Sequence, residues 1–132
     1  MVERPGNSGD ARVTATPSDR PVSLVTLDEF LRDRQINQVD LIKIDVQGFE
    51  EKVLLGGRNT IERFKPQILI ELDPPLLRAQ GCSEDLVVEI LLGYGYQLYV
   101  ARRRALVPFQ LPIESNLTNI FCLARAPRPV VS

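Results

Sequence analysis

The stretch from Asp40 to Glu50 constrains the fold more than any other part of the sequence. An apolar run reaches a carboxylate at Asp45, turns at Gly48 and continues into a helical pattern that starts with an acid. This order is typical of a strand, turn and helix in a parallel α/β sheet, where ligands bind beyond the carboxyl ends of the strands. We therefore expect the fold and any chemistry to centre on this stretch.

The composition is that of an ordinary globular domain. The chain has 132 residues, of which 44% are hydrophobic and 25% are charged, enough for about one domain with a real core. Sixteen basic and 17 acidic residues give a net charge of -1, so nothing indicates binding to nucleic acid. The one basic cluster, Arg102 to Arg104, predicts a solvated turn between two strands.

The histidine and cysteine content limits the reactions that this chain can catalyse. The chain has no histidine, which excludes a Ser-His-Asp triad and most zinc sites within it. Cys82 and Cys122 are far apart and form no Cys-x-x-Cys pair, which predicts free thiols in a reducing compartment. We find neither an apolar run of ~20 residues nor the apolar core of a signal peptide at the start, and therefore expect a cytoplasmic protein.

The sequence divides into three parts. We expect a flexible N-terminal segment over residues 1–21, with strand-like alternation only at Ala11–Thr16, an α/β domain over residues 22–126, and a frayed tail at 127–132. Within the domain, Val22–Thr26 predicts a short extended piece before the first helix.

Helical and strand patterns alternate along most of the domain. Pro74 and Pro75 are expected to stop the second strand, and the pair Gly56–Gly57 is interpreted as a packing feature within the second helix. Thr26, Asp28 and Ser83 are candidate helix N-caps. The predicted helices are 27–35, 49–64 and 83–92, and the predicted strands are 39–46, 67–72, 96–101 and 119–124.

This order predicts a mostly parallel sheet with right-handed crossovers. The strands at 39–46 and 67–72 are apolar on both faces, which is typical of central strands covered by helices. The strands at 96–101 and 119–124 have no helix between them, so we expect an antiparallel pair that adds a hairpin to one edge.

Two carboxylates are the best candidates for chemistry. Asp45 and Glu71 stand at the ends of successive predicted strands, and in a parallel pair about 5 Å apart they would converge on one rim. Such a pair can push its pKa values apart and make one member a base. In the alternative interpretation, Glu71 caps a backbone group or pairs with Lys43, whose burial would require an ionic partner. Asn119 could face the same rim.

Glu50 allows two interpretations of equal weight. An acid in the first turn of a helix is stabilised by the helix dipole, by ~0.3–1 kcal/mol, and that alone explains its presence. A functional role at the rim explains it equally well. A metal site formed by Asp45, Glu50 and Glu71 is a much weaker alternative, and we expect no resident metal.

Taken together, these segments resemble the FkbM family of S-adenosylmethionine-dependent methyltransferases. The resemblance implies a partial Rossmann-like methyltransferase fold, with this chain as its second half. By analogy, Asp45, Gln47, Gly48 and Glu50 would line the cofactor cleft, with Glu71 nearby. The motifs that carry the resemblance are Val25–Leu31, Val39–Glu50, Val53–Gly57, Pro66–Glu71, Gly95–Tyr96 and Asn119–Phe121.

The sequence departs from the family pattern in two places. Gln47 stands where many members have an acid, which keeps a hydrogen-bonding side chain but removes a charge. The glycine-rich loop that holds the methionine part of the cofactor has no counterpart here, so we expect the cofactor-binding half to lie outside this chain.

Two functions follow from the resemblance. The first is O-methyl transfer to a small-molecule or glycan hydroxyl, with Asp45 or Glu71 as the base and S-adenosylmethionine as the donor. The second is a non-catalytic methyltransferase-like remnant that acts through association. A sheet cut through its middle exposes an edge and an apolar face, so we expect a homo-oligomer or a complementing N-terminal half. The acceptor itself is not encoded in any motif, because acceptor pockets vary freely on one fold.

Overall fold

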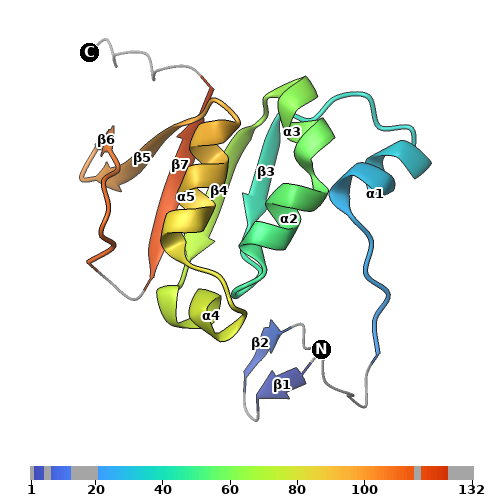
Figure 1. Cartoon of the computed structure of the whole chain (residues 1–132), viewed down its shortest axis with the longest axis horizontal. Coiled ribbons are helices and arrows are strands. Elements are labelled where there is room, and N and C mark those ends of the chain that lie inside the picture. Colours follow the sequence, from blue (N-terminus) through green and yellow to red (C-terminus); the bar gives the residue numbers. More distant parts are fainter. Residues whose placement is uncertain (1, 5–6, 13–20, 115–116, 125–132) are drawn as a thin grey trace.

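A computed structural model describes residues 2–4, 7–12, 21–114 and 117–124 of the chain. Five strands form one mixed sheet, and a separate pair of short strands lies near the N-terminus (Figure 1). In chain order the elements are β1 (Val2–Arg4), β2 (Asn7–Arg12), α1 (Leu27–Asp33), β3 (Leu41–Ile44), α2 (Glu50–Gly56), α3 (Arg58–Phe64), β4 (Gln67–Leu72), α4 (Pro74–Ala79), α5 (Glu84–Gly93), β5 (Gln97–Arg102), β6 (Ala105–Pro108) and β7 (Thr118–Leu123).

The prediction of a mostly parallel sheet is wrong. The strand order is β3-β4-β7-β5-β6, and only the β3–β4 pair is parallel; the other three pairs are antiparallel. The physical reason is that β7 follows β6 without a helix and returns into the space between β4 and β5. β4 and β5 run in the same direction, since each is antiparallel to β7, but they are not hydrogen-bonded to each other.

The C-terminal strands combine a confirmed prediction with a wrong one. β5 and β7 are antiparallel neighbours, as expected. The hairpin at the sheet edge is formed by β5 and β6, however, while β7 lies inside the sheet. β6 was not predicted because Pro108 ends it, and proline is tolerated in strands chiefly at edges such as this one.

β3 is also placed differently from the prediction of a central, helix-covered strand. It stands at the end of the five-stranded sheet, and its Leu41 side chain is 62% exposed. Lys43 is exposed as well, so it is not the buried lysine that the sequence indicated. β3 carries apolar side chains on both of its faces, but it is not buried on both faces.

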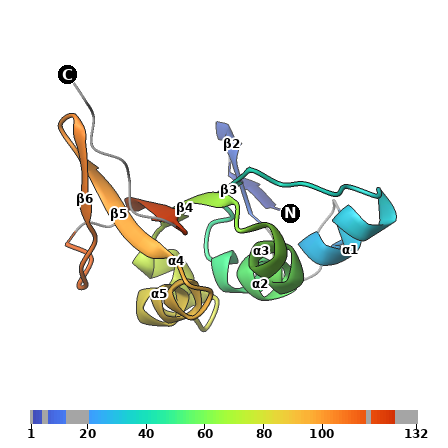
Figure 2. The ribbon, with the colours of Figure 1, turned by 90° about the horizontal axis from the view of Figure 1, so that it is seen from above.

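In the described part of the chain, α2, α3, α4 and α5 lie on one face of the sheet, and no helix lies on the other face (Figure 2). The buried side chains of the sheet point to the helical layer, where each fully buried aliphatic side chain contributes ~1.5–3 kcal/mol. They include Ile44, Ile68, Ile70, Leu72, Ile120 and Cys122, and they meet Leu54, Ile61, Val87 and Leu91 from the helices. Both cysteines are free and buried.

The predicted helix at 49–64 is two helices. α2 ends at Gly56 and α3 begins at Arg58, with Gly57 between them. A side chain at Gly56 would lie 3.2 Å from the Cβ of Thr26, and one at Gly57 would lie 2.9 Å from a methyl carbon of Leu27. The interpretation of the glycine pair as a packing feature is confirmed, because these glycines let the start of α1 approach closely.

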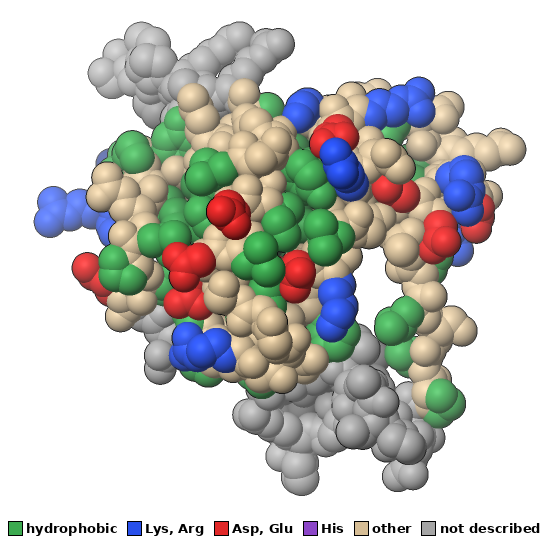
Figure 3. All heavy atoms as spheres, in the orientation of Figure 1, with side chains coloured by type: hydrophobic (Ala, Val, Ile, Leu, Met, Phe, Trp, Pro, Cys, Tyr) green, Lys and Arg blue, Asp and Glu red, His purple; other side chains and the backbone are tan. Residues whose placement is uncertain are grey.

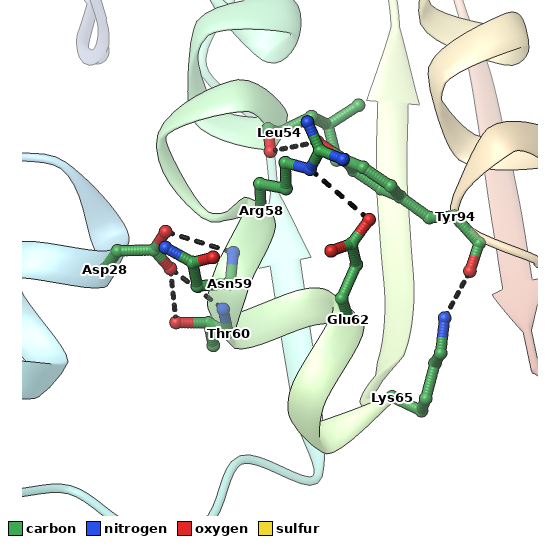
Figure 4. Close-up of polar contacts among 8 residues, drawn as sticks. All are labelled: Asp28, Leu54, Arg58, Asn59, Thr60, Glu62, Lys65 and Tyr94. Carbon is green, nitrogen blue, oxygen red and sulfur yellow. Dashed lines mark hydrogen bonds and ion pairs between the residues drawn. The ribbon is translucent and has the colours of Figure 1, made fainter.

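The N-cap predictions are confirmed for two residues and wrong for the third. Thr26 forms a capping box with Glu29 at the start of α1, and the Ser83 hydroxyl accepts from the Leu86 N–H. Asp28 does not cap its own helix. Its carboxylate accepts the backbone N–H groups of Asn59 and Thr60, at 3.0 and 2.9 Å, and the Thr60 hydroxyl at 2.6 Å (Figure 4).

Two predicted segments lie partly or wholly outside the described residues. The expected strand at Ala11–Thr16 overlaps the end of β2 at residues 11–12, and its remainder is not described. The tail expected at 127–132 is not described either. Within the described ranges, no helix has the length and apolar character that crossing a bilayer requires.

We predict that Asp28 fastens α1 to α3. Burial acts to raise the pKa of Asp28, but the hydrogen bonds from Thr60 and Asn59 outweigh it and lower the pKa below its ordinary value. Asp28→Ala should lower the free energy of unfolding by about 1–2 kcal/mol, measured by urea unfolding with circular dichroism. Because the folded pKa is lowered, this stabilisation is fully present above the unfolded pKa and should be lost as pH falls through the lowered pKa of the folded state.

Asp33→Ala in the same helix is the matched control, since Asp33 only pairs with Arg32 at the surface. Its effect should stay within about 0.5 kcal/mol at every pH. Equal losses for the two variants would contradict the role given to Asp28.

Candidate functional site

The strand register brings the two predicted carboxylates together. β3 and β4 pair in parallel, with Ile44 opposite Ile70. The next position along each strand places Asp45 beside Glu71. Side chains alternate along a strand, so both point to the face that carries no helix, opposite to the buried Ile44 and Ile70.

Asn119 adds a third side chain beside Asp45 and Glu71, and we call these three residues the rim. β7 pairs with β4 in antiparallel register, and Asn119 lies opposite Glu71. Asn119 and Asp45 are exposed and Glu71 is half-buried. The structure thus brings these three polar side chains together near the carboxyl ends of β3 and β4, as the sequence indicated for all three.

The electrostatics of the rim act on Glu71. Burial raises the pKa of Glu71, and the negative charge of Asp45 raises it further. Lys43, on the same face, and hydrogen bonding with Asn119 lower the pKa, but the net shift is upward. A carboxylate with a raised pKa accepts a proton more readily than an ordinary one, which suits a general base.

The Glu50 carboxylate accepts hydrogen bonds from the loop that follows β3. Its side chain is only 1% exposed. Its carboxylate accepts the Gly48 N–H at 3.0 and 3.2 Å and the Val46 N–H at 3.3 Å. These bonds support the structural interpretation of Glu50, because they use the carboxylate to hold the loop in shape.

The loop turns through two left-handed residues. Gln47 has a φ of 50° and Gly48 a φ of 106°. A side chain at Gly48 would lie 2.5 Å from the carbonyl oxygen of Leu76 and 2.9 Å from Gln80, so the loop packs directly against α4. Glycine is required here both by the backbone conformation and by the close approach.

α4 was not predicted, although the sequence held a signal for it. Asp73 accepts the Leu76 N–H at 3.2 Å as N-cap, and Pro74 occupies the first turn. Proline is favoured at the first helical position, so the prolines that end β4 also start α4. The signal that could have revealed this helix was the acid directly before the proline pair.

The predicted cofactor contacts therefore fall into two groups. Asp45 and Gln47 lie at the rim, exposed and half-buried respectively. The Gly48 N–H and the Glu50 carboxylate are already bonded to each other. The assignment of all four residues to a cofactor stays a prediction. Among the described side chains, no three acids, cysteines or histidines gather in a way that could hold a metal ion.

A cavity of about 590 Å³ lies elsewhere, between α1 and α3. Asp28, Arg32, Asn59 and Arg63 are among the residues that line it, and it contains none of the rim residues. At the rim itself, Asp45 and Asn119 are exposed and Glu71 is half-buried.

Comparison with known proteins identifies the class. Residues 3–98 match the family model described as the methyltransferase FkbM domain. This match covers well over half of the 132 residues, and the chain belongs to the FkbM methyltransferase family. No curated protein and no solved structure matches the chain significantly.

We predict that the raised pKa of Glu71 depends on Asp45. Carbon-detected NMR titration should give Glu71 a pKa above its ordinary value. Asp45→Asn should lower that pKa because it removes a neighbouring negative charge, and Lys43→Met should raise it further. Asp40→Asn, at an exposed residue that bonds Gln38, is the control. An unchanged pKa of Glu71 in Asp45→Asn would show that the two carboxylates do not converge.

We also predict a steric requirement at Gly48. Gly81 has a similar left-handed φ of 75°, yet a side chain there would meet nothing within 4 Å. Gly81→Ala should therefore cost about 1–2 kcal/mol from backbone strain alone. Gly48→Ala should cost a further ~1–3 kcal/mol because it forces the loop away from α4. Urea unfolding of both variants measures the difference, and equal costs would contradict the packing of this loop.

Proposed function

We propose that the chain contributes the acceptor side of an S-adenosylmethionine-dependent O-methyltransferase active site. The observation that carries this proposal is the pair Asp45 and Glu71 at the carboxyl ends of two parallel strands, in a chain of the FkbM family. Ligands of open α/β sheets bind at such ends. The proposed acceptor is a hydroxyl group of a small molecule or a glycan, and the proposed location is the cytoplasm.

Methyl transfer requires little from the protein beyond the positioning of the reactants and a general base. S-adenosylmethionine would supply an electrophilic methyl group on a sulfonium sulfur. The residues of this chain would hold the acceptor hydroxyl and take its proton as the acceptor oxygen receives that methyl group. Glu71 is suited to take this proton because its pKa is raised, and Asp45 is suited to orient the acceptor beside it.

The loop after β3 supports the donor side in this proposal. Asp45 and Gln47 would contact the cofactor from the rim. Glu50 would act one step removed, since its carboxylate holds the Val46 and Gly48 N–H groups and so fixes the loop that carries both residues. The exposed rim is consistent with a cleft whose second wall comes from a complementing N-terminal half.

A second candidate function is favoured by a different observation. Among the described strands, β3 stands at one edge of the sheet and has an exposed leucine, and edge strands can bind other strands. The chain could thus act as a non-catalytic member of an assembly, either with another copy of itself or with a complementing chain. The transfer assay described next separates the two functions, because an assembly role does not require the carboxylate of Asp45.

We predict that Asp45→Asn abolishes most methyl transfer. The assay mixes the chain with a separately expressed N-terminal half of an FkbM methyltransferase, labelled S-adenosylmethionine and a panel of hydroxyl acceptors. Loss of the carboxylate that orients the acceptor should reduce kcat by about 10²-fold, while Asp40→Asn should leave kcat unchanged. Full activity in Asp45→Asn would contradict the catalytic proposal, and absence of transfer with every acceptor would favour the assembly role.

A further inference from the structure

The cavity between α1 and α3 is separate from the rim, and the proposed methyl transfer does not use it. Every residue that lines it falls between Asp28 and Phe64, so one continuous stretch of the chain builds the whole cavity. It includes residues 36 and 37, just before β3 begins, whereas Asp45 follows the other end of that strand. Its volume of about 590 Å³ is within the range of about 300–1,000 Å³ that is usual for small-molecule sites.

Two neighbouring helices form the walls of this cavity (Figure 1). Asp28 joins them at one end, because its carboxylate accepts the N–H groups of Asn59 and Thr60 (Figure 4). Arg32 on α1 and Arg63 on α3 each lie one helical turn beyond this junction. Both arginines line the cavity, so two guanidinium groups border the same space from different helices.

The acids of these two helices already have partners. Figure 3 shows basic and acidic side chains together on the surface over α1 and α3. Arg63 has no acid among the described residues, where it stacks on Phe64 at 5.0 Å from the ring centroid and makes no hydrogen bond or ion pair. Arg32 has only an exposed pair, and such pairs are weak. The acids and their partners are Asp28 with Asn59 and Thr60, Glu29 with Thr26, Asp33 with Arg32, and Glu62 with Arg58.

The other lining residues suit an organic anion. Arginine binds carboxylate and phosphate groups through paired N–H donors. A cation would instead meet two guanidinium charges, against the single carboxylate of Asp28, which already accepts three hydrogen bonds. Three amides add donors and acceptors, and three apolar side chains can contact a carbon skeleton. The amides are Gln35, Asn37 and Asn59, and the apolar side chains are Leu31, Ile36 and Phe64.

We propose that the cavity between α1 and α3 binds a small organic anion, in which a carboxylate or phosphate group is attached to an apolar body. Arg32 and Arg63 would hold the anionic group from the two helices, and Leu31 and Phe64 would contact the apolar body. This site does not rest on methyl transfer, because it shares no residue with the rim.

Titration of the full chain, followed by NMR, tests the proposal. The probes are phenyl phosphate, phenylacetate and phenylacetamide, which has nearly the shape of phenylacetate without its charge. We expect saturable shifts of the amide signals at residues 31–37 and 59–64, with a Kd of about 1 mM or lower for at least one of the two anions. Phenylacetamide should bind at least about tenfold more weakly, because it lacks the negative charge that the arginines attract. The tighter of the two anions identifies the group that the site prefers.

Matched arginine variants decide whether the anion binds between the helices. Arg63→Met should raise the Kd of the preferred anion by about tenfold or more, and Arg32→Met by roughly threefold to tenfold. Arg63→Lys keeps the charge and should fall between the wild type and Arg63→Met. Arg34→Met is the control, because Arg34 stacks on Phe30 at 4.6 Å from the ring centroid but does not line the cavity. It should change the Kd by less than about twofold.

Four results would overturn the proposal. Two concern the probes, namely the absence of saturable shifts with both anions and equal affinity for phenylacetamide and the preferred anion. The third is an equal loss of affinity in Arg63→Met and Arg34→Met, which would indicate a general attraction to surface charge. The fourth is a set of shifts at Asp45 and Glu71 in place of those at α1 and α3, which would place the anion at the rim. The same spectra show whether each variant is folded.

Discussion

The parallel register between β3 and β4 is the constraint on which the rest of the domain depends. Setting Ile44 opposite Ile70 buries both side chains beneath the helices, and that burial is the main stabilising term available to the sheet. The same register places Asp45 beside Glu71 on the other face. A slip of one residue would turn the carboxylates toward the core and the isoleucines toward water, so the register that buries the core also sets the positions of the rim residues.

Two acids of one short motif have opposite roles in the structure. Asp45 is exposed at the end of β3, whereas Glu50 is buried and bonded to the loop between them. A buried carboxylate without partners would be very costly, and the N–H groups of Val46 and Gly48 remove that cost. The left-handed turn at Gly48 makes these groups converge. Glu50 can therefore hold the shape of the loop while Asp45 remains available to a ligand.

The sequence predicted local structure better than the arrangement of strands. The strand at Gln67–Leu72, the cap at Ser83 and the row of Asp45, Glu71 and Asn119 followed from periodicity and alternation, which depend on near neighbours. The direction and order of strands did not, because the insertion of β7 between β4 and β5 depends on contacts among distant segments. The exposure of Lys43 was missed for the same reason. An apolar strand cannot indicate by itself whether a second layer covers it.

The outer edge of β3 and the rim are physically connected, since Asp45 of the rim directly follows the last residue of β3. The outward backbone groups of Leu41 and Lys43 lie four and two residues before Asp45, respectively. A strand added at this edge would order β3 up to its carboxyl end and would set the charge beside Asp45. The pKa of Glu71 responds to the charges of Asp45 and Lys43, so a charge brought to this edge would also shift the pKa of Glu71.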